Sequence, residues 1–189
     1  MKDLFRGKLV RLTAEEPETQ AKSEVRWQRD SEFRRLADSD PTDVSSEKKI
    51  KEWLEKRNEE GFKPERYPFA IRALDGDKLI GFTGLWVDLI HSEGWVGIGI
   101  GEREFWGKGY GTDAMRLILQ YAFAELNLKR VSLALHSYNE RALKSYEKAG
   151  FTLEGRTRGD QRREGKRTDT LWMGILHDEW LQRQNGASK

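Results

Sequence analysis

Apolar and polar residues follow helical spacing in some stretches of the chain and strand-like alternation in others. Alternating apolar positions predict a first strand within residues 7–16. A weak amphipathic pattern predicts a helix over residues 21–37. Apolar residues at i, i+3 and i+4 predict a second, stronger helix over residues 45–61, which ends at a glycine. The first third of the chain is therefore expected to form one strand followed by two helices.

The middle of the chain has the pattern of antiparallel strands. Residues 67–74 and 78–90 flank the sequence Asp75-Gly76-Asp77, which is typical of a hairpin turn. Residues 93–104 are expected to pair antiparallel with the second of these strands. Within that stretch, apolar residues alternate with glycines. Glycine inside a strand often marks the close approach of another backbone or a ligand.

The last part of the chain alternates between helical and strand patterns. Residues 112–126 carry an apolar stripe at 3.6-residue spacing and predict the clearest helix. A strand over 129–138, a short helix over 139–150 and two long strands that turn near 163–167 complete the pattern. Strands and helices that alternate after an antiparallel meander predict an α/β (α+β) fold with a mixed sheet.

Composition narrows the class of protein. The chain is expected to form a single domain, residues 1–189, and its 37% hydrophobic and 35% charged residues are typical of a soluble globular protein. A formal charge of +2 does not favour a nucleic-acid partner. The absence of cysteine excludes disulfides, thiolate metal ligands and a cysteine nucleophile. Apolar runs are too short for a signal peptide or a membrane span, so a cytoplasmic location without membrane association is expected.

A glycine-rich stretch, Trp106-Gly-Lys-Gly-Tyr-Gly111, directly precedes the clearest predicted helix. A helix N-terminus carries unpaired N–H groups and a partial positive charge. Glycines let successive N–H groups face one anion, and Lys108 adds a cation. Neither the Walker nor the Rossmann nucleotide-binding pattern fits the stretch. Its local sequence therefore leaves two interpretations open, a pyrophosphate-binding loop or a plain turn.

A second patch lies on the predicted helix at 139–150. Asn139 and Tyr146 are seven residues apart, which places them on one face together with Ala142. An amide and a phenol so placed could flank an extended ligand. In the structural alternative, Asn139 caps the helix and Tyr146 packs in the core.

Together the two patches resemble the signature motifs of the GNAT N-acetyltransferases, within their RimJ/RimL-like branch. WGKGYGTDAM resembles the acetyl-coenzyme A (acetyl-CoA) pyrophosphate loop, [QR]-x-x-G-x-[GA], with Trp106 in place of Gln or Arg. NERALKSYEKAGFTLEG resembles the second motif. The resemblance implies the GNAT fold, a mixed and mostly antiparallel sheet of six to seven strands, splayed near its centre and flanked by about four helices.

The resemblance also implies roles for individual residues. The pantetheine arm of acetyl-CoA is expected between the glycine-rich strand 97–101 and residues 131–137. Tyr146 is expected to be the general acid that protonates the leaving thiolate. The implied cofactor-binding residues are Ile98, Ile100, Trp106, Gly107, Lys108, Gly109, Tyr110, Gly111, Thr112 and Asn139.

The expected activity is transfer of the acetyl group of acetyl-CoA to a primary amine. Because the chain has no cysteine, no cysteinyl acyl-enzyme can form, and direct attack in a ternary complex is the simplest route. Glu93, Glu102 and His136 are candidate general bases, with a water chain as the alternative. No metal site is predicted.

Several alternatives stay open. The acceptor could be a protein N-terminus or a small amine such as a polyamine, an amino acid or an aminoglycoside. A polyamine site would need clustered carboxylates, and a peptide site an open groove. A catalytically silent acyl-CoA-binding sensor is the alternative to an enzyme. The basic stretch 156–167 could contact RNA, an acidic protein or the 3′-phosphate of the coenzyme, or could be a solvated hairpin. A homodimer is expected only from the habit of the family.

Overall fold

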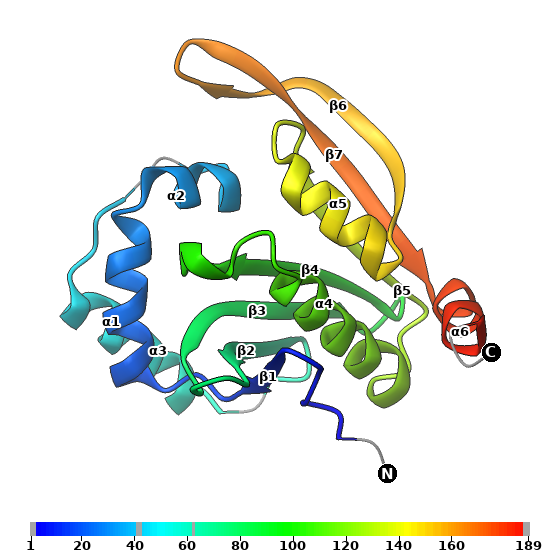
Figure 1. Ribbon diagram of the computed structural model, residues 1–189, viewed down its shortest axis with the longest axis horizontal. Coiled ribbons are helices and arrows are strands. Elements are labelled where there is room, and N and C mark those ends of the chain that lie inside the picture. Colours follow the sequence, from blue (N-terminus) through cyan, green and yellow to red (C-terminus); the bar gives the residue numbers. More distant parts are fainter. Residues whose placement is uncertain (1–2, 41–42, 62, 187–189) are drawn as a thin grey trace.

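The computed structural model describes residues 3–40, 43–61 and 63–186 (Figure 1). The strands are β1 Val10–Thr13, β2 Arg66–Ala73, β3 Leu79–Asp88, β4 Glu93–Ile100, β5 Arg130–His136, β6 Thr152–Arg163 and β7 Lys166–Leu176. The helices are α1 Pro17–Gln28, α2 Ser31–Ala37, α3 Glu47–Glu59, α4 Tyr110–Gln120, α5 Glu140–Ala149 and α6 His177–Gly186. A short 3₁₀ helix, Arg103–Phe105, precedes α4, and a π-helical segment, Tyr121–Glu125, continues it.

The seven strands form one mixed sheet in the order β1-β2-β3-β4-β5-β7-β6. Neighbouring strands in this order run antiparallel except for β4 and β5, which are parallel. This confirms the predicted fold class. In Figure 1, α1, α2 and α3 lie toward one side of the molecule, and α5 with the β6–β7 hairpin lies toward the other.

The described residues contain six α-helices, where about four were expected. The predicted helix over 21–37 is two helices, because Asp30 caps a new one: its side chain accepts hydrogen bonds from the backbone N–H groups of Glu32 and Phe33. The C-terminal helix α6 was not predicted, and it has no buried residue and hence no apolar stripe to reveal it. No helix in the described ranges is both long and apolar enough to cross a membrane.

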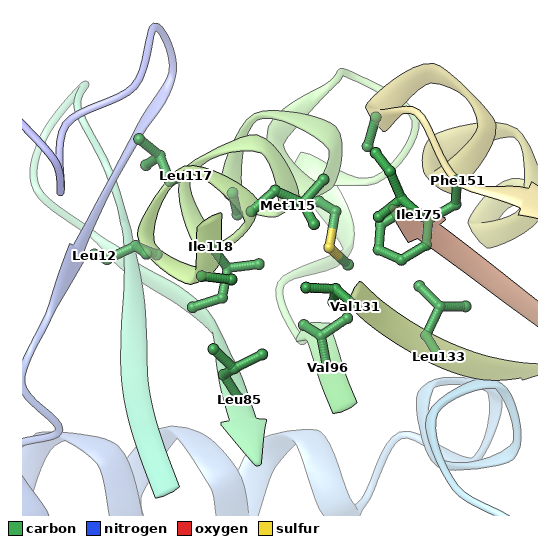
Figure 2. Close-up of a cluster of buried hydrophobic side chains, with 14 of the residues drawn as sticks. Leu12, Leu85, Val96, Met115, Leu117, Ile118, Val131, Leu133, Phe151 and Ile175 are labelled. Carbon is green, nitrogen blue, oxygen red and sulfur yellow. The ribbon is translucent and has the colours of Figure 1, made fainter. Parts of the chain in front are cut away.

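The main hydrophobic core lies between α4 and one face of the sheet. Figure 2 shows Met115, Leu117 and Ile118 of α4 among buried side chains that come from the sheet, including Val96 of β4 and Leu133 of β5. All five are at most 7% exposed. Helix α4 therefore packs on both strands of the parallel pair, β4 and β5. The apolar surface buried in this way stabilises both halves of the sheet.

A smaller core covers part of the opposite face of the sheet. Trp27 of α1 and Phe33 of α2 are buried there against Phe82 of β3. The rings of Trp27 and Phe33 lie 6.3 Å apart, and Phe33 meets Phe82 edge-on at 6.4 Å. These contacts hold α1 and α2 beside the C-terminal half of β4, which is where the cavity described below opens.

The close approach of β3 and β4 near this core requires a glycine. A Cβ atom at Gly81 would lie 2.1 Å from the carbonyl oxygen of Gly99 and 3.0 Å from the Cα of Ile100. Both are backbone atoms, which cannot move aside as a flexible side chain could. Gly155 of β6 is the useful comparison, because its nearest neighbour would lie 3.9 Å away, at ordinary contact distance.

We expect Gly81→Ala to lower the free energy of unfolding by about 1–3 kcal/mol, because the added methyl group overpacks β3 against β4. Gly155→Ala should change it by less than about 0.5 kcal/mol. Urea denaturation followed by circular dichroism measures both values. Equal stability of the two variants would show that β4 can shift to accept a side chain at position 81.

Candidate active site

The candidate active site lies where β4 and β5 separate. The two strands pair only through Glu93–Arg130, Gly94–Val131 and Trp95–Ser132 in the described chain. Beyond these pairs β4 continues to Ile100 and β5 to His136. This confirms the expected splay. A cavity of about 1160 Å³ opens there and is lined by residues 96–100 of β4 and 134–136 of β5.

One end of the cavity is formed by the glycine-rich loop and the N-terminus of α4. Gly107 and Gly109 have φ angles of +72° and +92°, in the left-handed region that favours glycine. Gly109 is the N-cap of α4, and no side chain among the described residues caps the helix. The first N–H groups of α4 are therefore available to an anion. Gly107, Gly109, Gly111 and Thr112 all line the cavity.

Positive charge concentrates at this end of the cavity. The Lys and Arg side chains that line the cavity come from α4, from α5 and from the segment before β1; they are Lys8, Arg116, Arg141, Lys144 and Lys148. Two carboxylates lie among them. Asp113 accepts hydrogen bonds from the backbone N–H groups of Leu9 and Val10, and Glu140 pairs with Lys144 at 3.8 Å. The balance is positive, which suits a ligand with several phosphates.

Arg141 lines the cavity and packs against the indole of Trp106. Its guanidinium carbon lies 3.8 Å from the centroid of the Trp106 ring, a cation–π contact. Trp106 is itself held by a hydrogen bond from its Nε1 to the carbonyl of Ile100 at 2.6 Å. No hydrogen bond or ion pair to Arg141 occurs within the described ranges. Burial lowers the pKa of Arg141, so an anionic ligand would relieve an unfavourable desolvation.

Arg103 contacts the same indole, at 5.1 Å, but its charge is compensated. It forms ion pairs with Asp30 at 2.5 Å and with Glu32 at 2.8 Å. Arg103 does not line the cavity. The two arginines therefore form a matched pair, one facing the cavity with free donors and the other bound to the protein.

Helix α5 brings Asn139 and Tyr146 to the cavity. Asn139 is the N-cap of α5: its Oδ1 accepts from the N–H of Ala142 at 3.1 Å, and its Nδ2 donates to the carbonyl of Leu36 at 3.2 Å. It thus has the capping role of the structural alternative and also lines the cavity. The ring of half-buried Tyr146 packs 6.1 Å from that of Phe151. Burial raises the pKa of Tyr146 to about 12, so its hydroxyl is protonated at neutral pH.

His136 lines the other end of the cavity. Leu135 points into the core under α4, so His136, the next residue of β5, points to the opposite face of the sheet. Its Nε2 lies 3.2 Å from the carbonyl oxygen of Asp38. A carbonyl can only accept, so Nε2 carries the hydrogen and the neutral ring has a free lone pair on Nδ1. His136 is 8% exposed, and its Nδ1 is buried without a partner in the described chain.

The wall around His136 is apolar and acidic. Phe33 and Leu36 of α2 and Trp172 of β7 supply its apolar part. The carboxylates that line this end are Asp38 and Asp160. Asp38 is paired with Arg34 at 3.3 Å, and Arg163 donates to the same Asp38 carbonyl as His136 does. The negative charge that faces the cavity here is therefore that of Asp160, which suits a cationic group.

The two glutamates predicted as candidate bases lie at opposite ends of β4, and neither lines the cavity. Glu93 accepts hydrogen bonds from Nε of Arg130 at 3.0 Å and from the hydroxyl of Ser132 at 2.7 Å. It therefore ties β5 to β4 at the point where the splay begins. Of the three candidate bases, the structure brings only His136 to the cavity.

Glu102 holds the other end of β4 in place. Its carboxylate accepts hydrogen bonds from Arg26 at 2.6 Å and from the indole of Trp27 at 2.9 Å, and it pairs with Lys78 at 2.8 Å. Burial by itself would raise the pKa of Glu102. The three donors outweigh this effect and leave the pKa below its ordinary value. Each carboxylate oxygen thus has a partner within the protein.

Most of the predicted cofactor-binding residues line the cavity; they are Ile98, Ile100, Trp106, Gly107, Gly109, Gly111, Thr112 and Asn139. Lys108 and Tyr110 do not line it. Tyr110 packs edge-on against Phe105 at 4.8 Å. Two other tryptophans of the neighbouring strands, Trp86 and Trp95, do not line it either.

The lining residues that sequence analysis missed include Arg141, Asp160 and Trp172. Arg141 could have been found from its place two residues after Asn139, on the first turn of the same predicted helix. Asp160 follows Gly159, and a glycine inside a strand pattern is a signal for a bulge. No such signal marks Trp172.

The fold and the splayed site define a GNAT acetyltransferase. Residues 9–152 match the acetyltransferase (GNAT) domain family, and the chain belongs to this family. A probable N-acetyltransferase of Bacillus subtilis, YjcK, is 32% identical over 144 residues, covering 76% of this chain and 77% of its own. An uncharacterized N-acetyltransferase of Bacillus licheniformis, p20, is 26% identical over 140 residues, covering 74% and 76%.

Among solved structures, the fold is similar to that of a spermidine N-acetyltransferase from Vibrio cholerae in complex with CoA and spermine. The TM-score is 0.76 at 23% identity, and the match covers 91% of this chain and 98% of the other. At this identity the likeness shows the fold alone.

We expect Arg141→Ala to raise the KM for acetyl-CoA about 10-fold with little change in kcat, because a charged hydrogen bond to the pyrophosphate is lost. Arg103→Ala is the matched control and should leave the KM within about 2-fold, since Arg103 is bound to Asp30 and Glu32. Steady-state kinetics with acetyl-CoA as the varied substrate measures both. Equal increases in the two variants would assign both arginines only to the packing of Trp106.

Proposed function

We propose that the protein transfers the acetyl group of acetyl-CoA to a primary amine, by direct attack in a ternary complex. The observation that carries this proposal is the division of charge along one continuous cavity. Unpaired helix N–H groups and five cations lie at one end, and His136 with the carboxylate of Asp160 lies at the other. An anionic donor and a cationic acceptor would each meet complementary charge there.

The donor end fits the parts of acetyl-CoA in sequence. The N-terminus of α4 and Arg141 would bind the pyrophosphate. The unpaired edges of β4 and β5 would hydrogen-bond the pantetheine amides, with Ile98 and Ile100 on the β4 side. The solved Vibrio cholerae enzyme, which contains CoA on a similar fold, supports this choice of donor.

The acceptor end supplies a base. The reacting amine must lose its proton before its nitrogen can attack, and Nδ1 of His136 is a buried lone pair without a partner in the described chain. Two contacts also set the orientation of the His136 ring. The ring stacks on that of Tyr138 at 5.0 Å, and its Nε2 donates to the Asp38 carbonyl. We therefore assign the role of general base to His136 rather than to Glu93 or Glu102.

The transfer step then balances as follows. The acceptor amine gives a proton to Nδ1 of His136, and its nitrogen forms a bond to the thioester carbonyl carbon. Strand N–H groups of β4 near Ile98 can stabilise the oxyanion. The C–S bond breaks, and the leaving thiolate takes the hydroxyl proton of Tyr146. His136 releases this first proton to solvent and then takes the second proton from the acylated nitrogen. Solvent carries the second proton to the oxygen of Tyr146, so the products are the acetylated amine, free CoA and one proton.

Tyr146 suits the role of acid because burial raises its pKa to about 12. Its hydroxyl therefore keeps its proton at any pH at which the enzyme would work, and it has no hydrogen-bond partner within the described residues that would compete with the sulfur. Tyr146 extends from α5, which packs with α4 on the core face of the sheet, and His136 lies on the other face. The base and the acid would thus act from opposite sides of the thioester.

The charge of the cavity lining narrows the class of acceptor amine. The acidic lining favours a small cationic amine over a peptide N-terminus, and spermidine acetyltransferases among the relatives and solved structures are consistent with this. Placement in the RimJ/RimL-like branch, a cytoplasmic location and a homodimer stay predictions from the sequence. A silent acyl-CoA-binding sensor would bind the donor without thiol release when an amine is added.

We expect Tyr146→Phe to lower kcat about 10²-fold while acetyl-CoA binding is retained, because the thiolate loses its proton donor. Tyr121→Phe is the control, since Tyr121 packs against Tyr67 and Phe69 outside the cavity. Thiol release from acetyl-CoA with a panel of amines measures kcat, and calorimetry with CoA measures binding. Unchanged turnover in Tyr146→Phe would remove the tyrosine from the mechanism.

We expect His136→Gln to lower kcat by about 10²-fold or more, because glutamine can donate to the Asp38 carbonyl but offers no basic nitrogen. The KM for acetyl-CoA should change little, since His136 lies at the acceptor end. The same thiol-release assay serves, run with saturating acceptor. Full activity in this variant would favour a water chain as the route for the amine proton.

A further inference from the structure

The basic β6–β7 hairpin carries one carboxylate that lines the acceptor end of the cavity, Asp160. It lies in a bulge, since the pairing register of β6 with β7 shifts between Thr157 and Gln161. Gly159, next to Asp160, has a φ of +62°. Bulges of this kind redirect side chains and often occur near active sites.

The bulge is held by contacts on both sides of Gly159. Its N–H donates to Oδ1 of Asp169 at 2.7 Å, and its carbonyl accepts from Arg167 at 2.6 Å. Asp169 is in turn paired with Arg156. The position of Asp160 is thus built into the hairpin by several charged hydrogen bonds.

The carboxylate of Asp160 is ionised but has no counter-ion in the described chain. A hydrogen bond from the Thr170 side chain, followed by smaller contributions from backbone groups and Gln161, holds its pKa below the ordinary value. The other carboxylates of the hairpin region are each paired with arginine, Glu164 with Arg35 and Asp169 with Arg156. Asp160 therefore presents an uncompensated negative charge to the cavity.

The sheet register places Asp160 at a definite distance from the gap. Thr170, which bonds to Asp160, is the direct pairing partner of His136. The Asp160 carboxylate is hydrogen-bonded to Thr170 on the intervening strand, so it lies about one strand spacing and one hydrogen bond from His136, or roughly 8 Å. His136, nine-tenths buried with its Nδ1 unpartnered among the described residues, marks where the reacting amine would lie. Asp160 is therefore too far away to hold that same nitrogen.

The surface beside these two residues suits an alkyl chain. Trp172 lies two residues after Thr170 on β7 and so faces the same side of the sheet. Its Nε1 donates to the hydroxyl of Thr157 at 2.7 Å, and Trp95 packs edge-on against it at 5.9 Å. A fixed indole ring that lines the cavity can contact methylene groups and also attract an ammonium group.

We propose that Asp160 is a specificity-determining residue that binds a second ammonium group of the acceptor, roughly 6–10 Å from the reacting nitrogen. The preferred acceptors are linear diamines and polyamines, whose methylene chain lies along Trp172. This inference rests on the proposed amine acetylation and adds a role that neither the GNAT motifs nor the predicted site residues include. Asp160 acts on substrate selection and not on the chemical step.

The test uses linear α,ω-diamines of increasing length, each compared with the linear monoamine of the same length. The wild-type kcat/KM should favour a diamine over its monoamine by about 2–5-fold, the effect of an ion pair to an exposed carboxylate. Asp160→Asn should abolish this preference, because it lowers the diamine kcat/KM more than the monoamine kcat/KM. Glu164→Gln is the matched control on the same hairpin, outside the cavity, and should keep the preference.

Calorimetric titration of the same amines into the protein with CoA present separates this inference from the proposed function. Asp160-dependent binding of diamines without acetylation of any amine would sink the proposed function and leave the inference standing. Equal binding of diamines and monoamines by the wild type would overturn the inference. A parallel loss of monoamine and diamine turnover in Asp160→Asn would also overturn it, because it would assign Asp160 to the hairpin structure alone.

Discussion

The architecture of this protein depends on the point at which the pairing between β4 and β5 ends. β4 and β5 stop pairing after Trp95 and Ser132, although both strands continue. Unpaired backbone groups in a sheet are costly to bury, so such a gap persists only where packing holds the strands apart and a ligand or water can reach them. Helix α4 provides that packing, because it contacts buried side chains of both strands. Glu93 ties the root of the gap through Arg130 and Ser132.

The gap also decides how chemistry can be arranged around a bound thioester. Because it passes through the sheet, residues from both faces reach it: Tyr146 from the helical side, and His136 from the side of Thr170 and Trp172. An amine can then approach on one face while the thiolate leaves on the other. The separation of charge follows the same geometry, with cations gathered on α4 and α5 and the carboxylate of Asp160 on β6. The match to the GNAT family spans residues 9–152, and Asp160 and Trp172 of the acceptor end lie outside it.

The parts of the site that sequence predicted well are those whose behaviour is local. Gly107 and Gly109 take left-handed φ angles and leave the N-terminus of α4 uncapped, and both properties follow from residues adjacent in the chain. The candidate bases show the opposite case. Glu93 and Glu102 flank the glycine-rich strand, which is where a catalytic carboxylate was expected. Both are held in structural contacts by residues distant in the chain, which no local pattern reveals. Glu93 binds Arg130 and Ser132, and Glu102 binds Arg26, Trp27 and Lys78.

The sequence by itself determined the order of the strands and the place of the glycine-rich loop before α4, because hydrophobic periodicity, glycine conformation and helix ends act over a few residues. The break of one predicted helix at Asp30 is also local, since Asp30 caps the N–H groups of Glu32 and Phe33, although periodicity alone does not show it. Only the tertiary structure decided that Arg141 would stack on Trp106 and that Asp160 would line the cavity. Both features depend on contacts between segments far apart in the chain. The energies of these contacts are set by burial and by charged partners rather than by neighbours in the sequence.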